Sequence, residues 1–330
     1  MGTSFMWVGR ALLGLVGLLA LLLIAGFTYQ QAASWGEQRS FPAPGQLVDI
    51  GGYRLHLYCV GEAATGSPTV ILDSANLGTV SNWVWVQGAI SSTTRVCAYD
   101  RAAIGWSDLS PQPQDTRQNA QALDTLLQKA EIAPPYVLVG HSFGGLFVRM
   151  YAELYPDKVA GMVLIEGTNP NGLAALGKPD VMPNAPDPAM IDAAPLVSRF
   201  GLLRLMRTVT SDPDLPSQQR AETDAYYAST RFAQTIKRQY HLFPTLLAQV
   251  RELNTPGRLG SKPLAIILGS QGDGGEAVWQ PLFAEQAALS TRSTTYVIEG
   301  ATHASLVDKQ EHGLQSAAII LDVVAAASVE

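Results

Sequence analysis

The segment YVLVGHSFGGLFVRMYAELY, residues 136–155, decides the fold class of this chain. Its first four residues read as a buried strand, and residues 145–155 read as an amphipathic helix. Between them lies the pattern Gly-x-Ser-x-Gly, with Ser142 at its centre. Glycines permit the cramped turn that joins a strand directly to a helix and holds a serine hydroxyl above the sheet. The segment therefore predicts a nucleophile elbow in an α/β protein.

The same alternation of apolar strands and helical patterns continues on both sides of this segment. Strands are predicted at 46–50, 53–60, 69–73, 95–100, 136–140, 160–166, 264–269 and 294–299, and helices at 82–90, 116–130, 144–154, 279–289 and 307–327. The middle strands are nearly continuous apolar runs, which is typical of parallel strands covered by helices on both faces. We therefore expect a doubly wound α/β core formed by residues 46–167 and 263–330.

Residues 168–262 interrupt this alternation. They contain no comparable strand and hold ten of the twenty prolines, whereas 217–254 reads as helical. We expect this segment to be an inserted lid of helices and irregular chain.

An apolar segment lies near the N-terminus. No charged residue occurs between Arg10 and Glu37, and the 19 residues from 11 to 29 would span about 29 Å as a helix, close to the hydrocarbon thickness of a bilayer. We expect residues 1–36 to form a membrane anchor, with a transmembrane helix over about 8–30, followed by a Pro-rich linker at 37–45.

The charge distribution around the anchor favours an extracytoplasmic body, because Arg10 precedes the apolar run while Glu37 and Arg39 nearly cancel after it. The alternative is a secreted protein, since the small residues 32–34, Ala-Ala-Ser, could be cleaved by a signal peptidase.

The amino-acid composition indicates which kinds of ligand the protein could bind. Only 15% of the 330 residues are charged, and the net charge is −6. A chain without a basic surplus is poorly suited to a phosphate backbone, so we expect no nucleic-acid partner. A small, weakly polar ligand fits better, and no motif points to a metal or an organic cofactor.

A serine nucleophile needs a base, usually a histidine, which in turn needs an orienting acid. In this kind of fold the order along the chain is nucleophile, acid, base. The histidines after Ser142 are His241, His303 and His312. We choose His303 because it follows the strand at 294–299 and so lies at a carboxyl edge of the sheet, where such proteins place their sites.

The orienting acid has two main candidates. Asp273 lies in the loop after the strand at 264–269, and it is our first choice. Glu166 ends the strand at 160–166 and could reach the same histidine from the next strand, so it is the alternative.

The oxyanion of the reaction needs two backbone N–H donors. The residue after the nucleophile, Phe143, supplies one of them, and the loop after the third strand supplies the other. We assign the second donor to Asn76, with Ala75 as the neighbouring option.

Three stretches carry a resemblance to a known family: LVDIGGYRLHLYCVG (47–61), RVCAYDRAAIGWSD (95–108) and YVLVGHSFGG (136–145). The chain resembles the α/β-hydrolase superfamily, and in particular its membrane-anchored or secreted bacterial members. The resemblance is close over residues 44–168 and looser over 263–325. It implies an eight-stranded, mostly parallel sheet of order 1-2-4-3-5-6-7-8, with the second strand antiparallel and the lid inserted after strand 6.

That strand order places Cys59 beside Cys97, so we expect a disulfide between them in an exported body. The resemblance also implies hydrolysis of an ester-type bond of a small or medium apolar acyl substrate through an acyl-enzyme at Ser142. The alternative is a ligand-binding or sensor protein on the same fold, without turnover.

Overall fold

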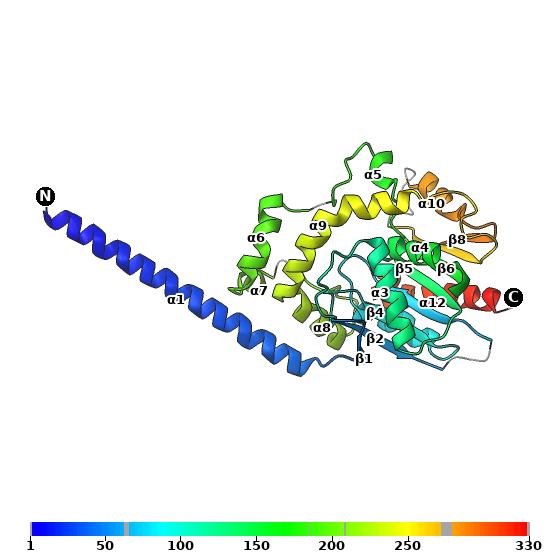
Figure 1. The fold of residues 1–330 in the computed structure, drawn as a ribbon, viewed down its shortest axis with the longest axis horizontal. Coiled ribbons are helices and arrows are strands. Elements are labelled where there is room, and N and C mark those ends of the chain that lie inside the picture. Colours follow the sequence, from blue (N-terminus) through cyan, green and yellow to red (C-terminus); the bar gives the residue numbers. More distant parts are fainter. Residues whose placement is uncertain (1, 63–65, 184, 208, 272–278, 329–330) are drawn as a thin grey trace.

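One eight-stranded sheet runs through the body of the protein (Figure 1). The computed structural model describes residues 2–62, 66–183, 185–207, 209–271 and 279–328. The strands are β1 (Gln46–Asp49), β2 (Arg54–Val60), β3 (Thr69–Asp73), β4 (Val96–Asp100), β5 (Tyr136–His141), β6 (Val159–Ile165), β7 (Leu264–Gly269) and β8 (Ser293–Ile298). Their order is β1-β2-β4-β3-β5-β6-β7-β8, and β2 is antiparallel to both of its neighbours. The predicted fold is confirmed in strand number, order and direction.

Helices cover both faces of the sheet because alternate residues of the central strands point to opposite sides. Along β5, Tyr136 and Leu138 join the apolar cluster on one face, whereas Val137 and Val139 join the cluster on the other. The first face is covered by α3 (Thr116–Lys129), α4 (Gly144–Leu154) and α10 (Gln280–Ala287). The second is covered by η1 (Val80–Trp83), α2 (Val84–Ile90), α11 (Ser305–Asp308) and α12 (Gln310–Ala327). The short η2 (Pro156–Lys158) leads into β6.

A helical insertion separates β6 from β7, where the sequence predicted one. It contains α5 (Gly172–Ala175), α6 (Pro188–Ser198), α7 (Leu202–Met206), α8 (Ser217–Tyr227) and α9 (Thr230–Arg251). The long helix α9 begins where the Ser229 hydroxyl accepts a hydrogen bond from the Phe232 N–H. Apolar residues of α9, among them Phe243 and Leu246, pack against α4. The insertion is thereby fixed over the end of the helix that follows Ser142.

The N-terminal helix α1 (Gly2–Ser40) is a single long helix that projects from the body (Figure 1). Its segment Trp7–Ser40 is long and apolar enough to cross a membrane. The helix includes residues 37–40, which the sequence assigned to a linker. It ends just before Pro42, because a proline disfavours helical geometry in the residue that precedes it.

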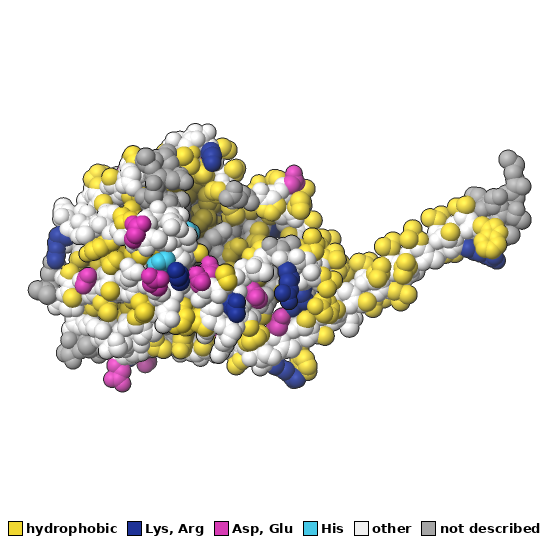
Figure 2. All heavy atoms as spheres, turned by 180° about the vertical axis from the view of Figure 1, so that it is seen from behind, with side chains coloured by type: hydrophobic (Ala, Val, Ile, Leu, Met, Phe, Trp, Pro, Cys, Tyr) yellow, Lys and Arg dark blue, Asp and Glu magenta, His cyan; other side chains and the backbone are white. Residues whose placement is uncertain are grey.

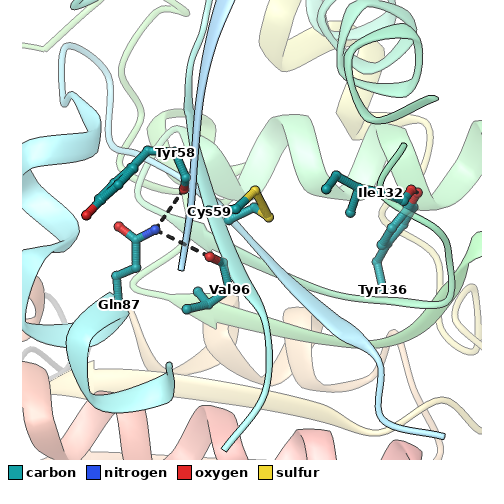
Figure 3. The surroundings of a disulfide bond; sticks show 7 residues. Tyr58, Cys59, Gln87, Val96, Ile132 and Tyr136 are labelled. Carbon is teal, nitrogen blue, oxygen red and sulfur yellow. Dashed lines mark hydrogen bonds between the residues drawn. A yellow bond between two sulfur atoms is a disulfide. The ribbon is translucent and has the colours of Figure 1, made fainter. Parts of the chain in front are cut away.

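A disulfide joins Cys59 of β2 to Cys97 of β4, as the resemblance implied. The two residues are direct partners in the antiparallel register. Figure 3 shows the disulfide on the side of the sheet that faces Ile132 and Tyr136. On the other side the Gln87 side chain donates to the carbonyls of Tyr58 and Val96. The disulfide therefore links β2 and β4 on one face of the sheet, and Gln87 links them on the other.

Candidate active site

Ser142 lies in the tight turn between β5 and α4, as the motif predicted. Its φ is +51°, a left-handed conformation that costs free energy for any residue with a side chain. Backbone hydrogen bonds hold it there: its N–H donates to the Ile165 carbonyl (3.0 Å), and its carbonyl accepts from Gly145 (3.0 Å) and Thr168 (2.9 Å). The turn is therefore tied to the end of β6, the neighbouring strand.

The start of α4 needs a residue without a side chain. A Cβ added at Gly144 would clash with the backbone carbonyl of Asp73, at the end of β3. This close approach brings the loop after β3, which contains Asn76, against the turn that contains Ser142. Gly144 thus allows the tight turn and also allows the loop after β3 to pack against it.

His303 is paired with Glu166. The distance between His303 Nδ1 and Glu166 Oε2 is 2.6 Å, and the second carboxylate oxygen, Oε1, accepts the Gly269 N–H at 2.8 Å. The Glu166 side chain is fully buried, whereas 43% of the His303 side chain is exposed. Glu166 also has a positive φ, +38°. Asp273, the first choice from the sequence, lies outside the described residues.

His141, the residue before Ser142, holds the segment that carries His303. Its Nε2 lies 3.0 Å from the His303 carbonyl, and the two imidazole rings have centroids 4.9 Å apart. A carbonyl only accepts hydrogen bonds, so His141 carries its proton on Nε2. Burial, together with the charge of His303, lowers the pKa of His141 to about 3, so its ring is neutral. His303 and Ser142 are thus brought to the same end of β5.

The loop after β3 is fixed from behind by Arg101. One guanidinium nitrogen pairs with the Asp73 carboxylate and donates to the Ser74 carbonyl (2.7 Å), and the other donates to the carbonyls of Ala75 (2.7 Å) and Asn76 (2.8 Å). In a trans peptide the carbonyl and the following N–H point in opposite directions. Arg101 therefore turns the Asn76 N–H away from itself, which leaves this donor available on the other side of the loop.

The insertion contacts both proposed oxyanion residues. The ring of Phe143 stacks on Phe243 of α9, with centroids 5.5 Å apart. The Gln239 side chain of α9 donates to the Asn76 carbonyl at 3.1 Å, and the Asn76 amide lies 3.8 Å from the Met182 sulfur. The part of the site that would hold an oxyanion is therefore covered by apolar and amide groups of the insertion.

The other late histidines have different partners. His241 is half exposed and lies 2.9 Å from the Asp192 carboxylate, and the buried His312 binds the Ser305 hydroxyl at 2.9 Å. Among the described residues, no group of three or more His, Cys, Asp or Glu side chains is arranged to hold a metal ion.

The residues from 70 to 314 match a model of the Alpha/beta hydrolase family. The chain belongs to this family. The match begins within β3 and ends within α12, so it includes the strand-turn-helix around Ser142, the insertion and the segment that carries His303.

Curated relatives match only part of the chain. The protein YqjL of Bacillus subtilis is 33% identical over 101 residues, which are 30% of this chain and 40% of that one. An uncharacterized vacuolar membrane protein of Saccharomyces cerevisiae is 28% identical over 129 residues, 34% of this chain and 20% of that one. This α/β hydrolase spans less than half the length of the curated relatives that it matches.

Solved structures share the fold over more of the chain. Cfl2 of Burkholderia cenocepacia is 20% identical, with a TM-score of 0.62, over 84% of this chain and 94% of its own. A membrane phospholipase A, described as a bacterial virulence factor, is also 20% identical, with a TM-score of 0.57, over 96% of this chain and 99% of its own. At these identities the likeness establishes the fold alone.

Two features of the site were not predicted from the sequence. In the sequence Arg101 appears only within the stretch 95–108 that carries the family resemblance, and nothing there indicates its ion pair with Asp73. The contact of His141 with the His303 carbonyl joins residues 162 positions apart and has no signal in the sequence.

Proposed function

We propose that this α/β hydrolase is a serine hydrolase that cleaves ester-type bonds, with Ser142 as nucleophile, His303 as base and Glu166 as the acid that orients His303. The proposal rests on two strained residues, Ser142 and Glu166, at the ends of neighbouring strands: Glu166 pairs with His303, and the carbonyl of His303 binds His141, the residue before Ser142. Strain of this kind persists where the surrounding structure enforces it, and it gathers at functional sites.

The chemistry follows from the roles of these groups. Ser142 Oγ attacks the ester carbonyl carbon while its proton passes to His303 Nε2. The N–H groups of Phe143 and Asn76 stabilise the oxyanion. The carbon–oxygen bond to the alcohol then breaks, and the leaving oxygen takes the proton from His303. Water then attacks the acyl-enzyme carbonyl while its proton passes to His303. The carboxylic acid product leaves, and Ser142 recovers its proton from His303.

Three further parts of the proposal rest on the sequence and the fold. The helical insertion acts as a lid, and its apolar contact with Phe143 favours an apolar acyl group. The apolar helix α1 anchors the chain in a membrane. The body lies on the extracytoplasmic side, where the Cys59–Cys97 disulfide is stable. The fold likeness to a membrane phospholipase A supports an acyl ester as the substrate.

The test is covalent labelling of the full chain with a fluorophosphonate probe, together with hydrolysis of p-nitrophenyl esters of graded chain length. Ser142→Ala should abolish both labelling and turnover, whereas Ser217→Ala, an exposed serine of α8, should change neither. Hydrolysis that survives in S142A would refute the assignment. A wild-type chain that binds ligands but neither labels nor hydrolyses would favour the alternative, a binding or sensor protein.

A further inference from the structure

Exposed apolar side chains gather on α6, on α7 and just beyond α7. They are between 41% and 68% exposed, and they are Met190, Leu196, Leu202, Leu205, Met206 and Val209. We call this set the α6–α7 face. Large exposed apolar patches on soluble bodies mark contact sites for proteins or membranes. Figure 2 shows that hydrophobic side chains run along α1 and continue onto the part of the body that α1 adjoins.

The α6–α7 connection touches α1 within its apolar segment. A Cβ added at Gly26 would lie 2.5 Å from the Phe200 carbonyl oxygen, and one added at Gly201 would lie 3.0 Å from the Tyr29 ring. The backbones therefore approach as closely as glycine allows. Further along α1, the Arg204 guanidinium pairs with Glu37 and also donates to the Gln30 side chain at 3.1 Å.

This contact sets the height of the insertion above a membrane. Residues 11–29 would cross the hydrocarbon layer, and Gly26 lies only three residues, or about 4.5 Å, before the end of that segment. A membrane that α1 spans therefore has its surface at Phe200, with the α6–α7 face beside it. Arg199 and Arg207 are exposed next to this face, and cations in that position favour anionic headgroups.

A groove adjoins the α6–α7 face. A cavity of about 730 Å³ lies between α6, α9 and residues 109–113, and Leu196 of the α6–α7 face is in its wall. Arg238 and Leu242 also line it, and the same two residues line a small cavity of about 30 Å³ that reaches Arg101 and Phe147. The larger volume is within the range that ligand pockets occupy.

We propose that the α6–α7 face rests on the lipid bilayer that α1 spans, and that the substrate of the site is an acyl ester of a lipid in that bilayer. This proposal rests on the proposed function and names the substrate class of the same site. The bilayer is the occupant because the face continues the apolar surface of α1 at the level where that helix leaves the hydrocarbon.

The first test measures lipid contact without using activity. The full chain is reconstituted in vesicles of phosphatidylcholine and phosphatidylglycerol, with a fluorophore on Leu205→Cys or, as the control, on Leu314→Cys of α12, an equally apolar residue that is also exposed. Lipids with a shallow doxyl label on the acyl chain should quench the probe at 205 and leave the probe at 314 unchanged. Equal quenching at both positions, or none at 205, would overturn the membrane contact.

The second test measures hydrolysis of phospholipid in the vesicles relative to hydrolysis of p-nitrophenyl butyrate in solution. In L205E/M206E this ratio should fall about tenfold or more, because charged side chains cannot enter the bilayer surface as Leu and Met do. In L314E it should stay at the wild-type value. Quenching at 205 without phospholipid hydrolysis would overturn the lipid substrate. Butyrate hydrolysis that survives in S142A would instead refute the proposed function.

Discussion

Replacement of Glu166 by glutamine tests the contact that defines the proposed triad. The variant keeps the size of the side chain, and its amide oxygen can still accept the Gly269 N–H that Oε1 accepts at 2.8 Å. The amide NH₂ group then faces His303 Nδ1, where Oε2 now lies at 2.6 Å. Since an NH₂ group only donates, His303 must carry its proton on Nε2, and it can no longer accept the proton of Ser142.

The wrong tautomer should reduce kcat by about 10³–10⁴, the effect expected when an orienting acid becomes an amide. At about 1.36 kcal/mol for each factor of ten, this corresponds to about 4–5.5 kcal/mol of transition-state stabilisation. Because the hydrogen bond to Gly269 survives, we expect the thermal unfolding temperature to change little.

The assay is kcat and KM on a p-nitrophenyl ester, with Asp273→Asn as the matched comparison. We expect D273N to lose at most about tenfold, because a carboxylate that does not orient the base contributes only a long-range charge effect. A loss of 10³ or more in D273N with near wild-type kcat in E166Q would refute the reasoning and make Asp273 the acid.

Three further predictions concern Arg101, a buried carboxyl group and the disulfide. Arg101→Lys should lower kcat/KM by about 10–100-fold, since the three donors of one ammonium group cannot replace two guanidinium nitrogens that bind three carbonyls and the Asp73 carboxylate, and the loss of one oxyanion donor costs about 10²–10³. Weaker inhibition by a trifluoroketone transition-state analogue would locate the defect at the oxyanion. Burial raises the pKa of Asp308 to about 7, so between pH 4 and pH 7 the folded protein retains a proton that the unfolded chain releases. Stability should therefore fall across that range by at most about 4 kcal/mol, and the melting temperature of D308N should exceed that of the wild type increasingly from pH 4.5 to pH 8. The Cys59–Cys97 disulfide closes a separation of 38 residues and should contribute about 4 kcal/mol by restricting the unfolded chain. C59A/C97A should melt several degrees lower, and a reductant should lower the melting temperature of the wild type while leaving that of the variant unchanged.

Local patterns were enough to predict the fold and the turn that contains Ser142. The strand before Ser142, the glycines around it and the helix after it are consecutive in the chain, and the structure reproduces their order with α4 at Gly144–Leu154. The position of Cys59 beside Cys97 followed from a strand order that the resemblance supplied.

Long-range features escaped prediction for a physical reason. Glu166 and Asp273 both follow strands that end at the same edge of the sheet, so residue type and spacing left both open, with Asp273 as the first choice. The pairing of Arg204 with Glu37 joins side chains 167 positions apart. Such contacts depend on how finished elements pack, and periodicity within one element contains no information about them.

The joint between α1 and the insertion has a consequence for the kinetics of the proposed enzyme. Arg204 binds Glu37 and Gln30 at once, so α1 is held against the insertion at two points. In the proposed membrane-bound enzyme, the body would then keep one orientation and one distance relative to the lipid surface. Turnover on membrane substrates should consequently follow the mole fraction of substrate lipid in the surface and not its bulk concentration, and each enzyme molecule should act only on the leaflet that it faces.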